Sequence, residues 1–173
     1  MSWVDQVKEA LPDYAKDTKL NLDAVIKRSS ISEDIANACA LSAAMATGNG
    51  KLVSFISSSF TEDQAVVRDA ALTAASLMAM TNSWYPYVEM ADDPALKGLP
   101  AGLRMNAIAT HGGTTKANFE AFSLAASIVG KCHFCVKAHY ETLRMEQGYT
   151  VEQLRDIGRI AAVMNSVAKV LNS

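Results

Sequence analysis

The chain has 173 residues, of which half are hydrophobic and a fifth are charged, and its formal net charge is −2. This length allows one compact domain or two small halves. The charge provides no basic face of the kind that nucleic-acid-binding proteins use to contact phosphates. The first residues lack the basic and apolar stretches of a signal peptide, and the longest apolar stretch, 70–80, is too short to cross a bilayer. We therefore expect a cytoplasmic protein that binds neither nucleic acid nor membranes.

The composition predicts an all-α fold. Ala, Leu, Met, Glu and Lys dominate, and almost no segment alternates with the period of two that is typical of strands. Capping boxes are expected at Ser30–Glu33, Thr61–Gln64 and Thr150–Gln153. In chain order, the pattern predicts helices over 3–16, 20–28, 32–46, 50–59, 62–80, 103–109, 115–129, 132–147 and 151–171.

The chain is predicted to contain two copies of one helical unit. Residues 20–25 match 103–108 at an offset of 83, and 41–45 match 124–128 at the same offset. We therefore expect a first repeat over 1–81, a connector over 82–102 and a second repeat over 103–173, packed together as one compact domain. The connector carries three of the four prolines and is expected to be tethered by Trp84, Tyr85 and Tyr87.

Three cysteines, Cys39, Cys132 and Cys135, are the first candidates for chemistry. An odd number of cysteines in a chain without a signal peptide argues against a structural disulfide framework. Cys39 corresponds to Phe122 in the other repeat, so it is expected to be a core residue. The close pair Cys132 and Cys135 instead indicates catalysis or metal binding.

The pair belongs to a C-x-x-C-x-x-x-H motif that ends at His139 and follows Gly130. Gly130 is expected to end one helix, which places Cys132 in the first turn of the next helix and the three reactive side chains on one face. The helix N-terminus and the neighbouring Lys131 favour a thiolate there. His139 is expected to lie close enough to Cys135 to exchange a proton with it.

Glu120 is the fourth candidate, because it is the only charged residue between Lys116 and Lys131. It is expected to face packed surface and to contact His139 across the hairpin between the two helices. At the offset of 83, the first repeat has no equivalent of these residues; it has Asn37 for Glu120, Asn49 for Cys132, Leu52 for Cys135 and Ile56 for His139. The scaffold therefore does not require them, which favours a role in chemistry.

The spacing E-x11-C-x-x-C-x-x-x-H, together with residues 10–17 and 102–106, resembles the AhpD family of alkyl hydroperoxide reductases, in the carboxymuconolactone decarboxylase-like superfamily. The resemblance covers nearly the whole chain. It implies a duplicated all-α fold, a homo-oligomer that is typically a trimer, and a peroxidase that reduces organic hydroperoxides. It also implies that the protein regenerates the peroxiredoxin AhpC with dihydrolipoamide as electron donor, supplied by a lipoylated dihydrolipoamide acyltransferase. The dithiol chemistry of such a peroxidase requires no bound cofactor or metal.

The resemblance also implies roles for the two cysteines: Cys135 forms the sulfenic acid, and Cys132 acts as proton donor and resolving thiol. The helix dipole favours Cys132 as nucleophile by about 0.3–1 kcal/mol, whereas His139 as base favours Cys135 by on the order of 10²-fold in rate. The larger effect points to Cys135 as well. One departure from the family pattern is Phe134, which stands where the family has a histidine before the second cysteine; His133 lies one place earlier.

Alternative interpretations stay open. Two thiolates and His139, with Glu120 or His111 as fourth ligand, would make a zinc-stabilised helical interaction module. A lactone decarboxylase of the same superfamily is a second alternative, although that chemistry has no evident need for a dithiol. His111 is expected to be a loop residue, and the methionines Met45, Met78 and Met80 are expected to serve as core packing. Phe134, with Phe119 and Phe122, fits either a thiol pocket wall or the core.

Overall fold

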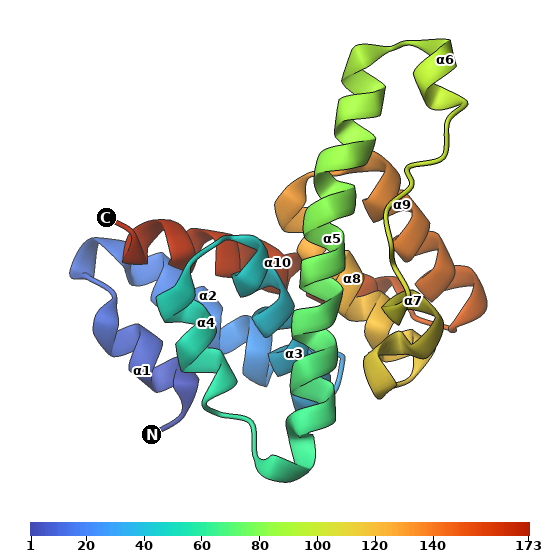
Figure 1. Cartoon of the computed structure of the whole chain (residues 1–173). Coiled ribbons are helices and arrows are strands. Elements are labelled where there is room, and N and C mark those ends of the chain that lie inside the picture. Colours follow the sequence, from blue (N-terminus) through green and yellow to red (C-terminus); the bar gives the residue numbers. More distant parts are fainter.

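In the computed structural model, which describes residues 1–173, the chain is a bundle of helices without strands (Figure 1). The predicted all-α fold is therefore confirmed. None of the helices is both long and apolar enough to cross a membrane. The elements are α1 (Trp3–Ala10), η1 (Asp13–Ala15), α2 (Lys16–Lys27), α3 (Glu33–Ala46), α4 (Gly50–Ser57), η2 (Glu62–Gln64), α5 (Ala65–Ala91), α6 (Pro94–Lys97), α7 (Ala107–Thr110), η3 (His111–Gly113), α8 (Lys116–Gly130), α9 (His133–Glu141), η4 (Thr142–Glu146) and α10 (Val151–Leu171).

Helices α3 and α8 form the centre of the bundle, and α5 and α10 pack against both. Residues 38–44 of α3 and 121–127 of α8 are buried on every side, which is why both stretches are apolar all round. Their many alanines allow the two backbones to approach closely, and the Ser42 hydroxyl donates to the Phe122 carbonyl across the seam at 2.8 Å. The two buried stretches are also 83 residues apart, the offset of the predicted repeat.

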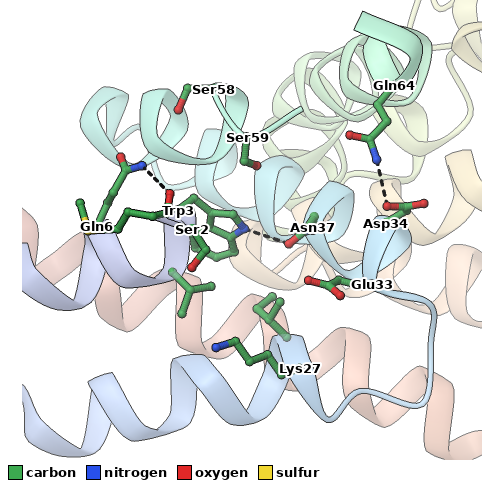
Figure 2. Close-up of a pocket in the computed structure, with 13 residues that line it drawn as sticks. Ser2, Trp3, Gln6, Lys27, Glu33, Asp34, Asn37, Ser58, Ser59 and Gln64 are labelled. Atoms are coloured by element: carbon green, nitrogen blue, oxygen red, sulfur yellow. Dashed lines mark hydrogen bonds between the residues drawn. The ribbon is translucent and has the colours of Figure 1, made fainter. Parts of the chain in front are cut away.

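The helix predicted over 3–16 is broken in two. α1 ends at Ala10, and Pro12 begins a 3-10 turn that leads into α2. Proline disfavours helical backbone at the residue before it, and Leu11 is accordingly extended. The buried Trp3 ties α1 to α3, because its indole N–H donates to the Asn37 side chain at 2.9 Å (Figure 2).

The helix predicted to end at residue 80 continues to Ala91, so α5 runs through the first half of the predicted connector. Pro86 lies inside it and has no amide hydrogen to donate to the Asn82 carbonyl, so one helical hydrogen bond is missing there. The helix stops where Asp92 adopts a left-handed conformation, with φ at 49°. In Figure 1 the end of α5 and the short α6 rise out of the bundle; we call residues 87–103 the arm.

Two further helix boundaries differ from the prediction. The helix predicted over 103–109 begins only at Ala107, because Gly102 has a positive φ of 68° and Met105 is turned inward against α5. The helix predicted over 132–147 ends at Glu141 and continues as one π-helical turn.

The capping boxes at Thr61 and Thr150 are confirmed, and the one at Ser30 is wrong. Ser30 lies before the N-cap residue of α3 and does not cap that helix. Its amide and its hydroxyl instead both donate to the Asp156 carboxylate of α10 at 2.8 Å. Asp156 is almost fully buried and also accepts from the guanidinium groups of Arg155 and Arg159 at 3.1 Å.

The surroundings of the Asp156 carboxylate predict that the protein loses stability in acid. Burial alone would raise the pKa of Asp156, but the hydrogen bonds from Ser30, Arg159 and Arg155 outweigh it and lower the pKa to about 2. The stabilisation is therefore present above pH 4 and lost as the pH falls through 2, and its size is about 2 kcal/mol. We expect Asp156→Asn to lower the free energy of unfolding by about that amount at pH 7 and by much less at pH 2. Urea denaturation of wild type and variant at pH 7 and at pH 2 measures this difference in the free energy of unfolding.

Asp69 offers a matched control, because it is an exposed carboxylate that also follows an arginine on a helix, Arg68. We expect Asp69→Asn to leave the free energy of unfolding within about 0.5 kcal/mol of wild type. Equal losses for both variants at both pH values would contradict the assignment of acid sensitivity to Asp156.

Candidate active site

The turn between α8 and α9 is held by a close contact with α5. α8 ends at Gly130, and a Cβ atom there would lie 2.1 Å from the side-chain nitrogen of Asn82. The Asn82 amide uses the space to donate to the Ala126 carbonyl at 3.2 Å. Lys131 then adopts a left-handed conformation with φ at 55°, and the chain turns back into α9. Glycine at position 130 therefore brings the cysteine motif against α5.

Cys132 was predicted to lie in the first turn of α9. It is instead the N-cap residue of that helix. Its sulfur accepts a hydrogen bond from the Cys135 amide at 3.2 Å, in the place where a serine or aspartate oxygen usually caps a helix. Two features therefore stabilise negative charge on this sulfur: the amide hydrogen bond and the helix N-terminus.

Cys132 and Cys135 are joined by a disulfide, with their Cα atoms 5.3 Å apart. Cys132 is 0% exposed and Cys135 is 3% exposed. The Cys132 sulfur lies 3.8 Å from the Thr81 carbonyl oxygen of α5. Cys39 is free and fully buried in α3, so its predicted place in the core is confirmed, and burial raises the pKa of its thiol well above the usual range.

The predicted contact between Glu120 and His139 is confirmed. The His139 Nδ1 atom lies 2.6 Å from Glu120 Oε2, and both side chains are largely buried between α8 and α9. A carboxylate can only accept, so Nδ1 carries the hydrogen of this bond. The other ring nitrogen, Nε2, lies 3.1 Å from the Met78 sulfur of α5. Glu120 thus fixes the ring and leaves Nε2 as the nitrogen that can gain or lose a proton.

An apolar pocket of about 150 Å³ brings Cys135 and His139 together. Its walls come from α5, α7, α9 and the segment before α7, and seven of its nine residues are hydrophobic: Met78, Thr81, Tyr85, Met105, Ile108, Phe134, Cys135, Ala138 and His139. A small organic molecule in this pocket would contact the Cys135 side of the disulfide. The four predicted site residues thus form one connected group.

His133 lies outside the pocket, whereas Phe134 lines it. His133 is largely exposed and lies 3.3 Å from the Glu89 carboxylate of α5. Phe134 stacks on Tyr85, with ring centroids 4.2 Å apart and planes inclined by 29°. His111 lies at the end of α7 beside Phe119, outside the pocket, as expected for a loop residue.

The ligand set of the zinc alternative is not assembled. No three His, Cys, Asp or Glu side chains are grouped so that they could hold a metal ion. A larger pocket, of about 360 Å³, lies between α1, α2, α3 and the segment that follows α4, and it is lined by polar residues such as Asn37, Glu33 and Gln64 (Figure 2). This larger pocket contains neither cysteine nor histidine. It therefore has no group for thiol chemistry and is not the candidate active site.

Sequence reasoning missed the contribution of α5 to the site. Met78 was predicted to be core packing, and it is buried, but its sulfur also contacts His139. Thr81 was given no role, and Tyr85 was expected only to tether the connector. Their one-turn spacing along α5 (78, 81, 85) is the signal that places all three on one helix face.

Comparison with known proteins agrees with this geometry. Residues 94–173, which contain Cys132 and Cys135, match the carboxymuconolactone decarboxylase family. The alkyl hydroperoxide reductase AhpD of Coxiella burnetii (strain Dugway 5J108-111) is 41% identical over 171 residues, covering 94% of this chain and 93% of the relative. The proteins of the same name from Beijerinckia indica and Rhodospirillum centenum are 36% and 37% identical, cover 98% of this chain, and are themselves covered to 94% and 91%. The chain therefore belongs to the alkyl hydroperoxide reductase AhpD family.

Proposed function

We propose that the protein is an antioxidant thiol peroxidase that reduces organic hydroperoxides with the Cys132–Cys135 dithiol. The observation that carries this proposal is the apolar pocket in which Cys135 of the disulfide and His139 of the Glu120–His139 pair lie together. A nucleophilic sulfur and a positioned proton carrier beside an apolar space are the groups that this reaction needs.

The oxidative steps begin with the reduced dithiol. The Cys135 sulfur attacks the terminal oxygen of the hydroperoxide, the O–O bond breaks, and Cys135 becomes a sulfenic acid. The other oxygen leaves as an alcohol after it takes up a proton from His139, whose ring Glu120 orients. The Cys132 sulfur then displaces the hydroxyl group of the sulfenic acid as water. Two electrons have passed from the two sulfurs to the peroxide, and the disulfide has formed.

An external dithiol of the dihydrolipoamide type returns the two electrons. One of its sulfurs attacks Cys135, which borders the pocket, and Cys132 leaves as a thiolate. The hydrogen bond from the Cys135 amide supports this direction, because it stabilises the charge on the departing Cys132 sulfur. The second sulfur of the donor then releases Cys135 and closes a cyclic disulfide.

The same exchange chemistry supports two protein partners. A reduced Cys132–Cys135 pair can pass its electrons to the disulfide of a peroxiredoxin of the AhpC type, and a lipoylated dihydrolipoamide acyltransferase can supply the dithiol. His133 and Lys137 of α9 are exposed and line a surface hollow together with Cys132. They offer polar contacts for a partner protein that binds there.

We also propose that the protein is a homotrimer, and the arm supports this. Its apolar side chains Met90 and Leu99 are 78% and 64% exposed, and the arm that carries them projects from the bundle (Figure 1). Exposed apolar side chains that gather on one projecting segment favour association. Light scattering is expected to return the trimer mass for wild type and a smaller mass for a Met90→Glu, Leu99→Glu double variant. A monomeric wild type at micromolar concentration would refute the trimer.

Turnover with tert-butyl hydroperoxide tests the function and the donor together. We expect alcohol to form at the expense of dihydrolipoamide, with rates at least 10²-fold lower for Cys132→Ser, because that variant cannot close the disulfide. Thioredoxin and glutathione are the comparison reductants. Equal rates with all three would refute the proposed donor class, and consumption of no hydroperoxide with any of them would refute the proposed function.

A further inference from the structure

The apolar pocket at Cys135 is small, and a stacked aromatic pair forms part of its wall. Its volume is about 150 Å³, and seven of the nine residues that line it are hydrophobic. A small apolar space of this kind favours a compact organic hydroperoxide such as tert-butyl hydroperoxide, which has six non-hydrogen atoms.

The aromatic pair is Tyr85 of α5 and Phe134 of α9, whose ring centroids are 4.2 Å apart. Both side chains line the pocket of Cys135, and both also line a second, outer hollow of about 370 Å³. The outer hollow contains charged residues, among them Glu89, Lys97 and Lys137. The stacked rings thus lie between the small space beside Cys135 and a larger hollow that has charged residues around it.

We infer that the Tyr85–Phe134 stack is a specificity-determining wall, which limits the hydroperoxide to a compact organic group. This inference rests on the proposed function. An unbranched alkyl chain that runs from Cys135 toward the two rings must either turn aside or displace one ring. Displacement separates two stacked aromatic rings, whose contact is favourable beyond the area that it buries. Removal of either ring joins the two spaces and gives the chain room to extend.

Tyr85 and Phe134 can also be substituted without loss of the fold. Phe134 is 56% exposed, and Tyr85 belongs to neither buried cluster of the core. Phe134 lies between the two cysteines, so its substitution can change their reactivity. Tyr85 lies outside the motif and on another helix, and it reports on the wall alone.

The test compares two hydroperoxides in a single turnover that needs no electron donor. Pre-reduced protein is mixed with tert-butyl hydroperoxide or with unbranched octyl hydroperoxide, and the remaining thiols are counted after quenching at successive times. The wild type is expected to react faster with the tert-butyl compound. Phe134→Ala and Tyr85→Ala are each expected to raise the octyl-to-tert-butyl rate ratio about 10-fold, the lower end of what a pocket discriminates for small apolar differences.

Tyr87→Ala is the matched control, because Tyr87 lies on the same part of α5, packs on Trp84 and lines neither hollow. Its rate ratio is expected to equal that of wild type. An unchanged ratio in Phe134→Ala and Tyr85→Ala, including a case in which both rates fall together, would overturn the wall and leave the proposed function standing. A wild type whose thiols react with neither hydroperoxide would overturn both.

Discussion

A Cys135→Ser variant is expected to form no sulfenic acid, whereas a Cys132→Ser variant forms one that persists. The physical reason is position: Cys135 borders the apolar pocket together with His139, while Cys132 is fully buried at the helix N-cap. Without Cys132, no neighbouring sulfur is present to resolve the sulfenic acid to a disulfide. Dimedone trapping followed by peptide mass spectrometry measures the adduct on each cysteine after one equivalent of hydroperoxide.

Cys39→Ser provides the control for this experiment, because Cys39 is the remaining thiol of the chain and is buried in α3. It is expected to behave as wild type, with a Cys132–Cys135 disulfide and no trapped adduct. An adduct on Cys132 in the Cys135→Ser protein, with none in the Cys132→Ser protein, would reverse the roles of the two cysteines.

The site could be predicted from the sequence because its four polar residues are local. Cys132, Cys135 and His139 are spaced at helical intervals, and Glu120 belongs to the preceding helix of the same hairpin. Short-range geometry of this kind follows from helix periodicity and from one glycine at the turn. The disulfide and the contact between Glu120 and His139 are both present in the structure.

The exact place of Cys132 was missed, although a matching position in the chain could have indicated it. Asn49, 83 residues earlier, is the N-cap of α4, and its side chain accepts from the Leu52 amide at 2.8 Å. Cys132 caps α9 in the same way with a sulfur, accepting from Cys135. Asparagine is a common N-cap residue. A comparison of the two positions would have shifted the predicted helix start by one residue.

The pocket residues that lie outside α9 could not be predicted, because their positions depend on contacts between segments far apart in the sequence. Met78, Tyr85 and Met105 meet α9 only after α5 has packed along α8 and residues 98–106 have folded back. The prolines also misled the prediction: Pro86 indicated a connector, yet the helix continues through it to Ala91. The loss of one hydrogen bond at a proline is tolerated there, since the Tyr85–Phe134 stack and the contact of Asn82 with α8 hold the helix in the turn just before Pro86.

Glu120→Gln is expected to slow oxidation of the dithiol by on the order of 10²-fold, the effect of a positioned proton carrier. Glutamine keeps the shape of the side chain and can still accept from His139 Nδ1, but it carries no charge to stabilise a protonated ring. His139→Asn removes the proton carrier itself and is expected to have at least the same effect. Both side chains lie 14–15% exposed at the edge of the α8–α9 contact, so neither change opens a core cavity. The measurement is the second-order rate of thiol loss in pre-reduced protein with tert-butyl hydroperoxide.

The size of the rate loss in Glu120→Gln distinguishes a role in proton transfer from an influence on thiolate formation alone. A free cysteine is about 3% thiolate at neutral pH, so ionisation alone changes the rate by at most about 30-fold, and raising the pH should then restore it. A rate defect that exceeds this limit and persists at pH 9 identifies Glu120 with the transfer of the proton to the departing alkoxide. Glu146→Gln is the matched control, because Glu146 forms an exposed ion pair with Lys116 at the start of α8, 2.7 Å apart, and does not line the pocket. Its rate should equal that of wild type, and a Glu120→Gln rate within threefold of wild type would remove the Glu120–His139 pair from the mechanism.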